Sequence, residues 1–153
     1  MLGIFFDADG TLWSHPKSKL NYVDKSLFEL FDHLNLNKIS YFVVSGTTKE
    51  IIDEKLKEFN IYCIDKNKII ALADGGINKG NKMQELILTE GFNKVIWVFD
   101  KIKDYNYAKT IENVRHVIIQ REHNNEDILE ASKIKEIEVV SSLGEVLKII
   151  KEV

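Results

Sequence analysis

Short continuous runs of hydrophobic residues alternate along this chain with longer stretches in which hydrophobic residues recur every three or four positions. Runs of the first kind predict buried β-strands, and stretches of the second kind predict amphipathic α-helices. The predicted strands are residues 2–6, 39–44, 61–64, 95–99, 114–119 and 137–140, with residues 68–73 as a further short strand or an extended loop. The predicted helices are residues 25–34, 49–59, 80–89, 105–111, 126–132 and 143–152. Asp24 is placed to cap the first helix, and Gly91 is placed to end the third.

Alternating strands and helices, with strands that are hydrophobic throughout, are typical of a parallel sheet covered by helices on both faces. We therefore predict a single domain over residues 1–153, with the α/β fold of a three-layer α/β/α sandwich and a mostly parallel, Rossmann-like sheet. In such sheets, ligands bind beyond the carboxyl ends of the strands. The residues that directly follow each predicted strand are therefore the first candidates for a functional site.

Composition and charge narrow the class of protein. The 153 residues are 44% hydrophobic and 29% charged, which is ordinary for a globular domain. The net charge of −3, from 21 basic and 24 acidic residues, gives no clear nucleic-acid signal. No hydrophobic run approaches the roughly 20 residues that cross a bilayer, and the first residues do not resemble a signal peptide. Cys63 is the one cysteine, which fits a small hydrophobic residue in a reducing compartment, so we expect a cytoplasmic protein with no membrane partner.

Acidic residues follow two of the predicted strands. Asp7 and Asp9 come directly after the first strand, and side chains two positions apart on a strand can point to the same side. Asp100 directly follows the strand that ends at residue 99, and Asp104, which could also cap a helix, comes four positions later. Carboxylates that lie close together repel one another unless a cation compensates, and oxygen ligands of this kind suit Mg²⁺.

Hydroxyl and ammonium groups stand at two further positions. Ser45 and Gly46 follow the second strand and lead into a helix, where free backbone N–H groups can bind phosphate. The alternative is that hydroxyl residues here only cap that helix. Lys79 stands near the start of the third helix, where a lysine is unfavourable unless it meets an anion. The alternative for Lys79 is a solvated surface position.

Taken together, these positions resemble the motifs of the haloacid dehalogenase-like superfamily over nearly the whole chain. The first motif of that family, a hydrophobic strand followed by Asp-x-Asp-Gly-Thr, matches Ile4–Leu12. The second motif, a strand that ends in Ser or Thr, matches Tyr41–Ser45. The motif lysine matches Lys79, with Lys82 as the rival. The fourth motif, Gly-Asp-x-x-x-Asp, matches residues 99–104, except that phenylalanine replaces the glycine.

The resemblance implies a Mg²⁺-dependent phosphate monoester hydrolase. Asp7 would be the nucleophile and form an aspartyl-phosphate, while Asp9 would protonate the leaving oxygen and then activate water. Mg²⁺ would be held by Asp7, Asp9 (through its backbone carbonyl) and Asp100, with Asp104 orienting the metal site or Lys79. The residues implied to bind the substrate phosphate are Thr11, Ser45, Gly46 and Lys79. Lys79 would also stabilise the charge that develops during transfer.

The resemblance also bears on what covers the site. Many members carry a cap domain inserted after the first or second motif. Here the 36 positions from Asp9 to Ser45 (45 − 9) and the 34 from Ser45 to Lys79 (79 − 45) are filled by the predicted elements, so we expect no cap. Capless members act on large substrates or build a lid by oligomerising. The expected partner is therefore a phosphorylated small molecule or a phosphorylated macromolecule, with a homo-oligomer as an option.

Two alternatives remain beside this reading. A catalytically silent, phosphate-binding or regulatory protein on the same fold is left open by Phe99, which replaces the usual glycine. A phosphate-accepting receiver domain would use Asp65, but the Asp-x-Asp spacing argues against it. His15, Arg121 and His123 are candidates for substrate contacts, or else exposed residues without a function.

Overall fold

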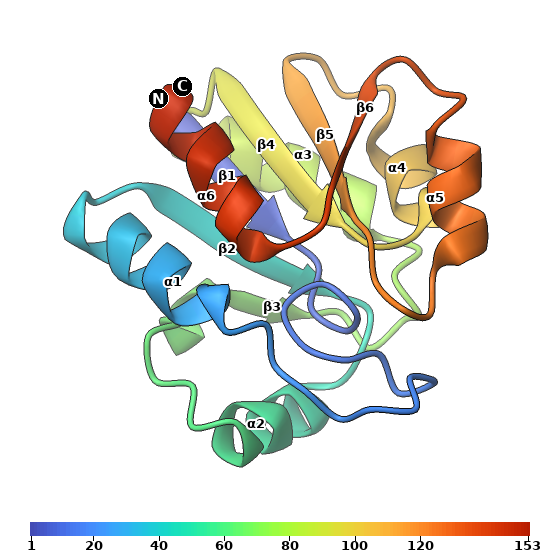
Figure 1. Ribbon diagram of the computed structural model, residues 1–153. Coiled ribbons are helices and arrows are strands. Elements are labelled where there is room, and N and C mark those ends of the chain that lie inside the picture. Colours follow the sequence, from blue (N-terminus) through green and yellow to red (C-terminus); the bar gives the residue numbers. More distant parts are fainter.

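The computed structural model describes residues 1–153, which form one six-stranded sheet between two layers of helices (Figure 1). The strands are β1 (Leu2–Phe6), β2 (Ser40–Ser45), β3 (Ile69–Ala71), β4 (Lys94–Phe99), β5 (Val114–Ile119) and β6 (Ile137–Val140). The helices are α1 (Ser26–Leu36), α2 (Lys49–Glu58), α3 (Lys79–Glu90), α4 (Ile102–Ala108), α5 (Asn125–Ala131) and α6 (Leu143–Glu152), with a short 3₁₀ turn, η1 (Lys66–Lys68). All the strands are parallel, in the order β3-β2-β1-β4-β5-β6.

Two hydrophobic cores, one on each face of the sheet, make the three layers. The larger core has 25 buried residues and joins the sheet to α1, α2 and α6. The smaller core has 13 buried residues and joins the opposite face to α3, α4 and α5. Figure 1 shows α1 and α6 side by side in front of the sheet, with α3 behind it. The predicted three-layer α/β/α sandwich is confirmed, and no cap domain interrupts the segments between β1 and α3.

The strand order fixes where a functional site can form. The chain winds outward in both directions from β1, so the order reverses between β1 and β4, and ligands bind at such a switch point. The backbone N–H of Asp7, just past β1, donates to the carbonyl of Val98 in β4 at 2.9 Å. The segments after β1 and β4 therefore leave the sheet next to each other. Receiver domains have the order 2-1-3-4-5, which this sheet does not have.

The prediction of a strand at residues 61–64 is wrong. Ile61 and Ile64 are buried, as their hydrophobicity requires, but they lie in an irregular connection between α2 and η1. Side chains take up the backbone groups of this segment: the amide of Asn35 donates to the carbonyl of Cys63 at 2.7 Å, and the backbone N–H of Asp65 donates to the hydroxyl of Tyr41 at 2.9 Å. The third strand of the sheet is instead β3, within the segment for which a strand or a loop was expected.

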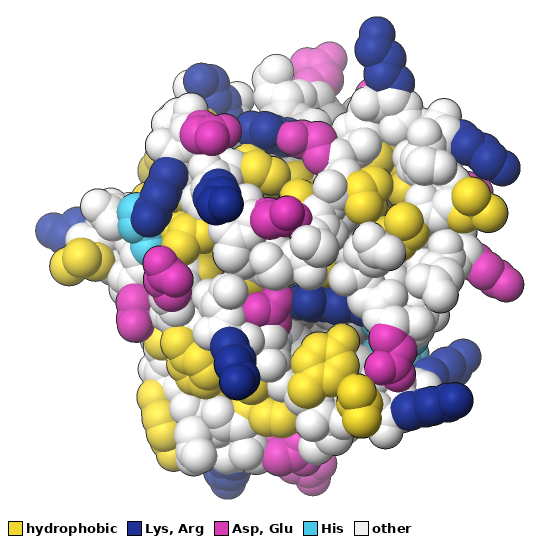
Figure 2. Space-filling view, in the orientation of Figure 1, with side chains coloured by type: hydrophobic (Ala, Val, Ile, Leu, Met, Phe, Trp, Pro, Cys, Tyr) yellow, Lys and Arg dark blue, Asp and Glu magenta, His cyan; other side chains and the backbone are white.

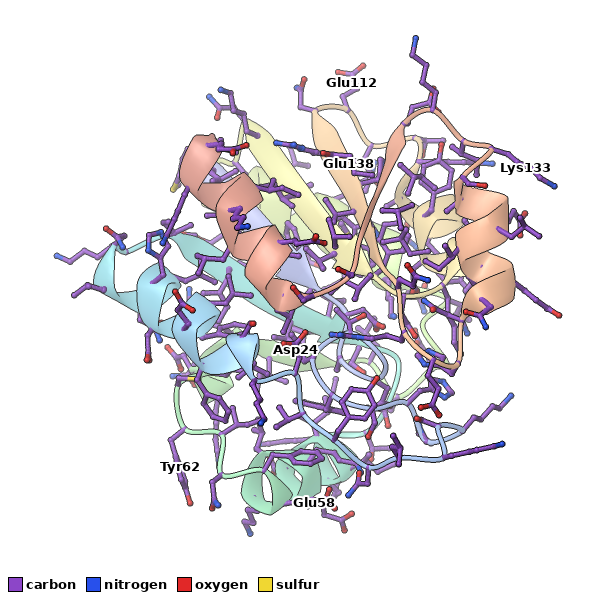
Figure 3. All side chains as sticks on the ribbon, in the orientation of Figure 1. Asp24, Glu58, Tyr62, Glu112, Lys133 and Glu138 are labelled. Atoms are coloured by element: carbon purple, nitrogen blue, oxygen red, sulfur yellow. The ribbon has the colours of Figure 1, made fainter.

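Two helix starts depend on contacts from elsewhere in the chain. Helix α4 begins three residues before the predicted 105, because the Asp127 carboxylate of α5 accepts the backbone N–H of Ile102 at 2.9 Å. Helix α1 begins at Ser26 with Lys25 at the N-cap position, so Asp24 lies one residue before the cap; its Oδ1 accepts the backbone N–H of Ser26 at 3.0 Å. Asp24 also accepts the backbone N–H of Leu143 at 2.9 Å and so ties the starts of α1 and α6 together (Figure 3).

Acidic and basic side chains are interspersed over the face drawn in Figure 2, with no continuous area of one sign. Measured by length and hydropathy, none of the helices qualifies as a membrane span.

Candidate active site

A polar cavity of about 260 Å³ opens at the carboxyl ends of β1, β2 and β4. None of the residues that line it is hydrophobic. The lining residues are Asp7, Asp9, His15, Ser45, Gly46, Thr47, Gly75, Lys79, Asp100, Lys101, Lys103 and Asp104. Four separate segments of the chain supply them, and nearly all the predicted site residues are among them.

Lys79 connects two carboxylates at the floor of this cavity. Its Nζ lies 2.6 Å from Oδ1 of Asp7 and 3.0 Å from Oδ1 of Asp104, and all three side chains are almost fully buried. Burial alone would lower the pKa of Lys79, but the charges of Asp7 and Asp104 outweigh burial and raise it above its ordinary value. Burial would likewise raise the pKa of Asp7, but Lys79 outweighs it and holds that pKa below the ordinary value. Asp7 is therefore an anion held in one orientation.

Asp100 is buried and has the negative charge of Asp7 close by. Burial, followed by the negative charge of Asp7, raises its pKa well above the ordinary value. Its Oδ2 shares a hydrogen bond of 2.6 Å with Nε2 of His123, while its Oδ1 is buried and has no hydrogen-bond partner. The buried amide of Asn124 holds the backbone in place by donating to the carbonyls of Asp100 at 2.7 Å and Ile119 at 2.8 Å. Asp104 is also shifted: burial and the charge of Asp7 raise its pKa to about 6, against the opposing effect of Lys79.

Asp9 is held by a tryptophan. The indole Nε1 of Trp13 donates to Oδ1 of Asp9 at 2.8 Å, and the backbone N–H of Gly10 donates to the carbonyl of Trp13 at 2.8 Å. Burial raises the pKa of Asp9, and the charge of Asp7 adds to this, while the Trp13 hydrogen bond opposes it. Gly10 has a φ of +82°, and a side chain there would collide with the Asp100 carboxylate, so only glycine fits this turn. Trp13 thus orients Asp9, a contact that no sequence motif indicates.

The segment after β2 forms the opposite wall. Ser45 lies on the cavity with its Oγ accepting the backbone N–H of Thr47 at 3.2 Å, while it is Thr48 that caps α2, at 3.3 Å from the N–H of Ile51. Thr48, and not Ser45, is therefore the residue that caps α2, and Ser45 lies on the cavity wall. A side chain at Gly46 would collide with the backbone of Gly76, so this wall also depends on a glycine.

Thr11 is fully buried and does not line the cavity. Its hydroxyl donates to Oδ2 of Asp7 at 3.3 Å, so it contacts the carboxylate rather than the open space. Lys82 lies outside the site as well, because it pairs with Glu85 at 3.2 Å on the surface of α3. Of the two candidate lysines, Lys79 is the one that lines the cavity.

Arg121 secures the loop that follows Asp9. Its guanidinium donates to the backbone carbonyls of Gly10 at 3.2 Å and Thr11 at 2.6 Å, and it pairs with Asp24 at 3.0 Å. These partners occupy the side chain in a nearly buried position, so Arg121 holds the loop in place and does not face the cavity.

His123 contributes to the site by supporting other side chains. Besides its bond to Asp100, its ring stacks on that of His15, with centroids 4.7 Å apart. His15 lines the cavity, and its Nδ1 accepts the backbone N–H of Lys17 at 3.0 Å. Of the three substrate-contact candidates, His15 alone lies on the cavity.

Phe99 does not enter the cavity. Its ring is fully buried in the core between the sheet and α3 to α5, 5.7 Å from the ring of Trp97 and 6.4 Å from that of His116. Successive side chains of a strand point to opposite faces, so a bulky residue here leaves the path of Asp100 free.

The donor set fits a divalent cation. One carboxylate oxygen from each of Asp7, Asp100 and Asp104 lies within 4.8 Å of the others, and all three residues are buried. If all three carboxylates are ionised, Lys79 balances one of the three negative charges, and a divalent cation would balance the other two. The Oδ1 of Asp100 has no hydrogen-bond partner and is therefore available to a metal ion. The side chain of Asp9 lies outside this group, so any metal contact of Asp9 falls to its backbone carbonyl.

Sequence comparison matches the chain to no protein-family model and to no curated protein. Comparison of folds does find relatives. D,D-heptose 1.7-bisphosphate phosphatase from B. bronchiseptica, complexed with magnesium and phosphate, aligns over 100% of both chains with a TM-score of 0.78 and 12% identity. A Had-superfamily hydrolase from Ehrlichia chaffeensis aligns over 98% of this chain and 96% of its own with a TM-score of 0.67 and 13% identity.

A third relative is 3-deoxy-D-manno-octulosonate 8-phosphate phosphatase from Moraxella catarrhalis, in complex with a magnesium ion, a phosphate ion and a KDO molecule. It aligns over 98% of this chain and 85% of its own, with a TM-score of 0.61 and 14% identity. At these identities the comparisons establish the fold. The chain has the fold of the haloacid dehalogenase-like phosphatases, and the resemblance indicated by the motifs is confirmed at that level.

Proposed function

We propose that this protein is a Mg²⁺-dependent phosphate monoester hydrolase that works through an aspartyl-phosphate on Asp7. The observation that carries the proposal is the buried ion pair between Asp7 and Lys79, which opens onto a polar cavity shared with Asp9, Ser45 and Asp100. The related structures solved with magnesium and phosphate support the same chemistry.

Asp7 is suited to be the nucleophile because it is anionic, oriented and open to the cavity. Lys79 holds one of its oxygens and Thr11 contacts the other. In the first step, an Asp7 oxygen forms a bond to phosphorus while the bond from phosphorus to the ester oxygen breaks. In the second step, water attacks the aspartyl-phosphate, which releases phosphate and restores Asp7.

Asp9 is suited to move the proton in both steps. Its raised pKa favours a protonated carboxyl that can donate to the leaving oxygen. After that transfer, the carboxylate can accept a proton from the attacking water. The hydrogen bond from Trp13 fixes one oxygen of Asp9, so the proton is held at a defined place beside Asp7.

Lys79 and Ser45 would bind the phosphoryl oxygens from two sides of the cavity, with the backbone at Gly46 allowing close approach. A positive charge that is fixed before the reaction stabilises the charge that develops in the transition state. Mg²⁺ would be held by Asp7, Asp100 and the backbone carbonyl of Asp9, with the buried carboxylate of Asp104 beside them. When bound, the ion supplies positive charge that neutralises the phosphate and the two excess carboxylate charges.

The substrate class is also part of the proposal. No cap covers the cavity, so either a phosphorylated small molecule or a phosphorylated group on a macromolecule can reach it. A homo-oligomer that covers the site is compatible with this open arrangement.

The proposal is tested by hydrolysis of p-nitrophenyl phosphate in Mg²⁺ and in EDTA, with the wild type beside Asp7→Asn. Activity that requires both Mg²⁺ and Asp7 supports the proposal. Activity that persists in Asp7→Asn or in EDTA contradicts it. Because a selective phosphatase can reject this substrate, a set of phosphorylated metabolites is assayed in parallel by phosphate release.

A further inference from the structure

One wall of the cavity carries hydrogen-bond donors that the proposed hydrolysis does not use. Lys101 and Lys103 line the cavity on either side of Ile102, and neither has a carboxylate within 4.0 Å. Lys79, by contrast, donates to both Asp7 and Asp104, and only its third N–H is left for the phosphate that is removed. Basic residues are unfavourable at the start of a helix, so the stability of α4 does not explain this pair.

His15 extends this wall. Its Nδ1 accepts the backbone N–H of Lys17, so the neutral ring carries its proton on Nε2. The stack on His123 fixes the plane of the ring. Burial lowers the pKa of His15 to about 4, and the charge of Lys101 acts in the same direction, so the ring is a neutral N–H donor near neutral pH. We call His15, Lys101 and Lys103 the donor wall.

The rest of the cavity restricts what the donor wall can bind. A binding pocket for a drug-sized ligand usually has roughly 300–1,000 Å³ and mostly hydrophobic walls. This cavity has about 260 Å³ and no hydrophobic side chain in its lining. An aromatic ring or a nucleobase would find no surface on which to stack, whereas a small group rich in oxygen atoms would find donors.

We propose that the donor wall binds a second anionic group of the substrate, a carboxylate or a further phosphate, on a small hydrophilic leaving group. The proposal rests on the proposed function for the reaction, but the binding of the second anion can be measured without turnover. It makes His15, Lys101 and Lys103 the residues that determine specificity, whereas Lys79 and Ser45 bind the phosphate that is removed.

The test compares phosphoglycolate with ethyl phosphate, which differ by a carboxylate in place of a methyl group. The wild type and Lys101→Gln/Lys103→Gln are assayed with both compounds, and Lys133→Gln is the matched control because its side chain points away from the molecule (Figure 3). We expect the wild type to prefer phosphoglycolate in kcat/KM by about tenfold or more, as a hydrogen bond to a charged group allows. The preference should fall to about threefold or less in the double variant, which would keep no more than a weak neutral bond, and it should persist in Lys133→Gln.

A binding measurement separates this inference from the proposed function. Asp7→Asn, which should not turn over either compound, is titrated with both in Mg²⁺ by calorimetry. Tighter binding of phosphoglycolate that depends on Lys101 and Lys103 supports the donor wall, even if the wild type hydrolyses neither compound and the proposed function fails. Equal binding of the two compounds, no binding, or a preference that survives in the double variant overturns it, even if both compounds are hydrolysed.

Discussion

The ammonium group of Lys79 lies 2.6 Å from Oδ1 of Asp7, although the two residues are 72 positions apart in the chain. The same ammonium group lies 3.0 Å from Asp104, so one lysine holds the segment after β1 and the first turn of α4 together. The pair is almost entirely shielded from water, so its charges depend on each other. Lys79 should therefore be required both for the stability of the site and for the proposed reaction.

Lys79→Met should reduce both turnover and stability. Loss of the fixed positive charge should lower kcat by about 100-fold or more. Removing one partner of a buried ion pair should lower the free energy of unfolding by about 3–5 kcal/mol, because the carboxylates lose their compensation. Denaturant unfolding measures the second effect. Lys82→Met is the matched control, since its exposed pair with Glu85 should contribute under about 1 kcal/mol to stability. Equal losses of kcat and of unfolding free energy in the two variants would refute the role of Lys79.

Asp100→Ala should change the dependence of activity on Mg²⁺. The variant removes a buried carboxylate from the three whose oxygens converge, so the Mg²⁺ concentration for half-maximal activity should rise by about 10-fold to 100-fold. A titration of activity against Mg²⁺ measures this shift. If the Mg²⁺ response is unchanged in Asp100→Ala but shifted in Asp104→Ala, the ligand role belongs to Asp104.

The two arginines of the chain offer a matched pair for the loop after Asp9. Arg121→Met loses two bonds to backbone carbonyls and a nearly buried pair with Asp24, so unfolding should become easier by about 3 kcal/mol or more. Arg115→Met loses only a half-exposed pair with Glu138 and should cost about 1 kcal/mol or less (Figure 3). Thermal and denaturant unfolding of the two variants compare these values directly. A similar cost for both would show that Arg121 does not secure the loop.

His116 should make stability depend on pH. Its ring is buried between Phe99 and Tyr105, its Nδ1 has no hydrogen-bond partner, and burial lowers its pKa to about 4. The unfolded chain binds a proton at the ordinary value of 6.5, so between pH 6.5 and pH 4 the unfolded state holds a proton that the folded state lacks. The free energy of unfolding should therefore fall as the pH is lowered through this window.

Through this pH window, His116 should lower the free energy of unfolding by roughly 3 kcal/mol in total. His116→Leu removes it, so the difference in unfolding free energy between the variant and the wild type should shift in favour of the variant from pH 7 to pH 4. Other groups that titrate in this window contribute equally to both proteins and cancel in the difference. Parallel stability curves for the two proteins would show that His116 does not titrate as its surroundings require.

Sequence patterns identified most of the residues that line the cavity. Asp7 and Asp100 each follow a strand that is hydrophobic throughout, and a charged residue in that position stands at the functional edge of a parallel sheet. Lys79 could be singled out because lysine is unfavourable at a helix start unless an anion is near. Lys101 and Lys103 lie in the same segment as Asp100 and Asp104, but only the two acids match a motif, so the sequence does not single out the lysines.

Contacts between distant parts of the chain could not be predicted in this way. Arg121 binds the carbonyl of Gly10, 111 positions away, and nothing local to Arg121 indicates it. Asn124 looks like an ordinary loop residue, yet its amide joins the ends of β4 and β5. The error at residues 61–64 has the same origin, because short hydrophobic runs are buried equally well in a strand or in a connection whose backbone groups are bound by side chains.

The central claim is that Asp7 carries the phosphoryl group, and chemical trapping tests it most directly. The protein is mixed with Mg²⁺ and a phosphate ester that it hydrolyses, and the reaction is then quenched. Reduction with borohydride converts an aspartyl-phosphate to homoserine. Peptide mass spectrometry then locates the converted residue. We predict conversion at Asp7 alone. Turnover without any conversion at Asp7, or conversion at another aspartate, would contradict the account.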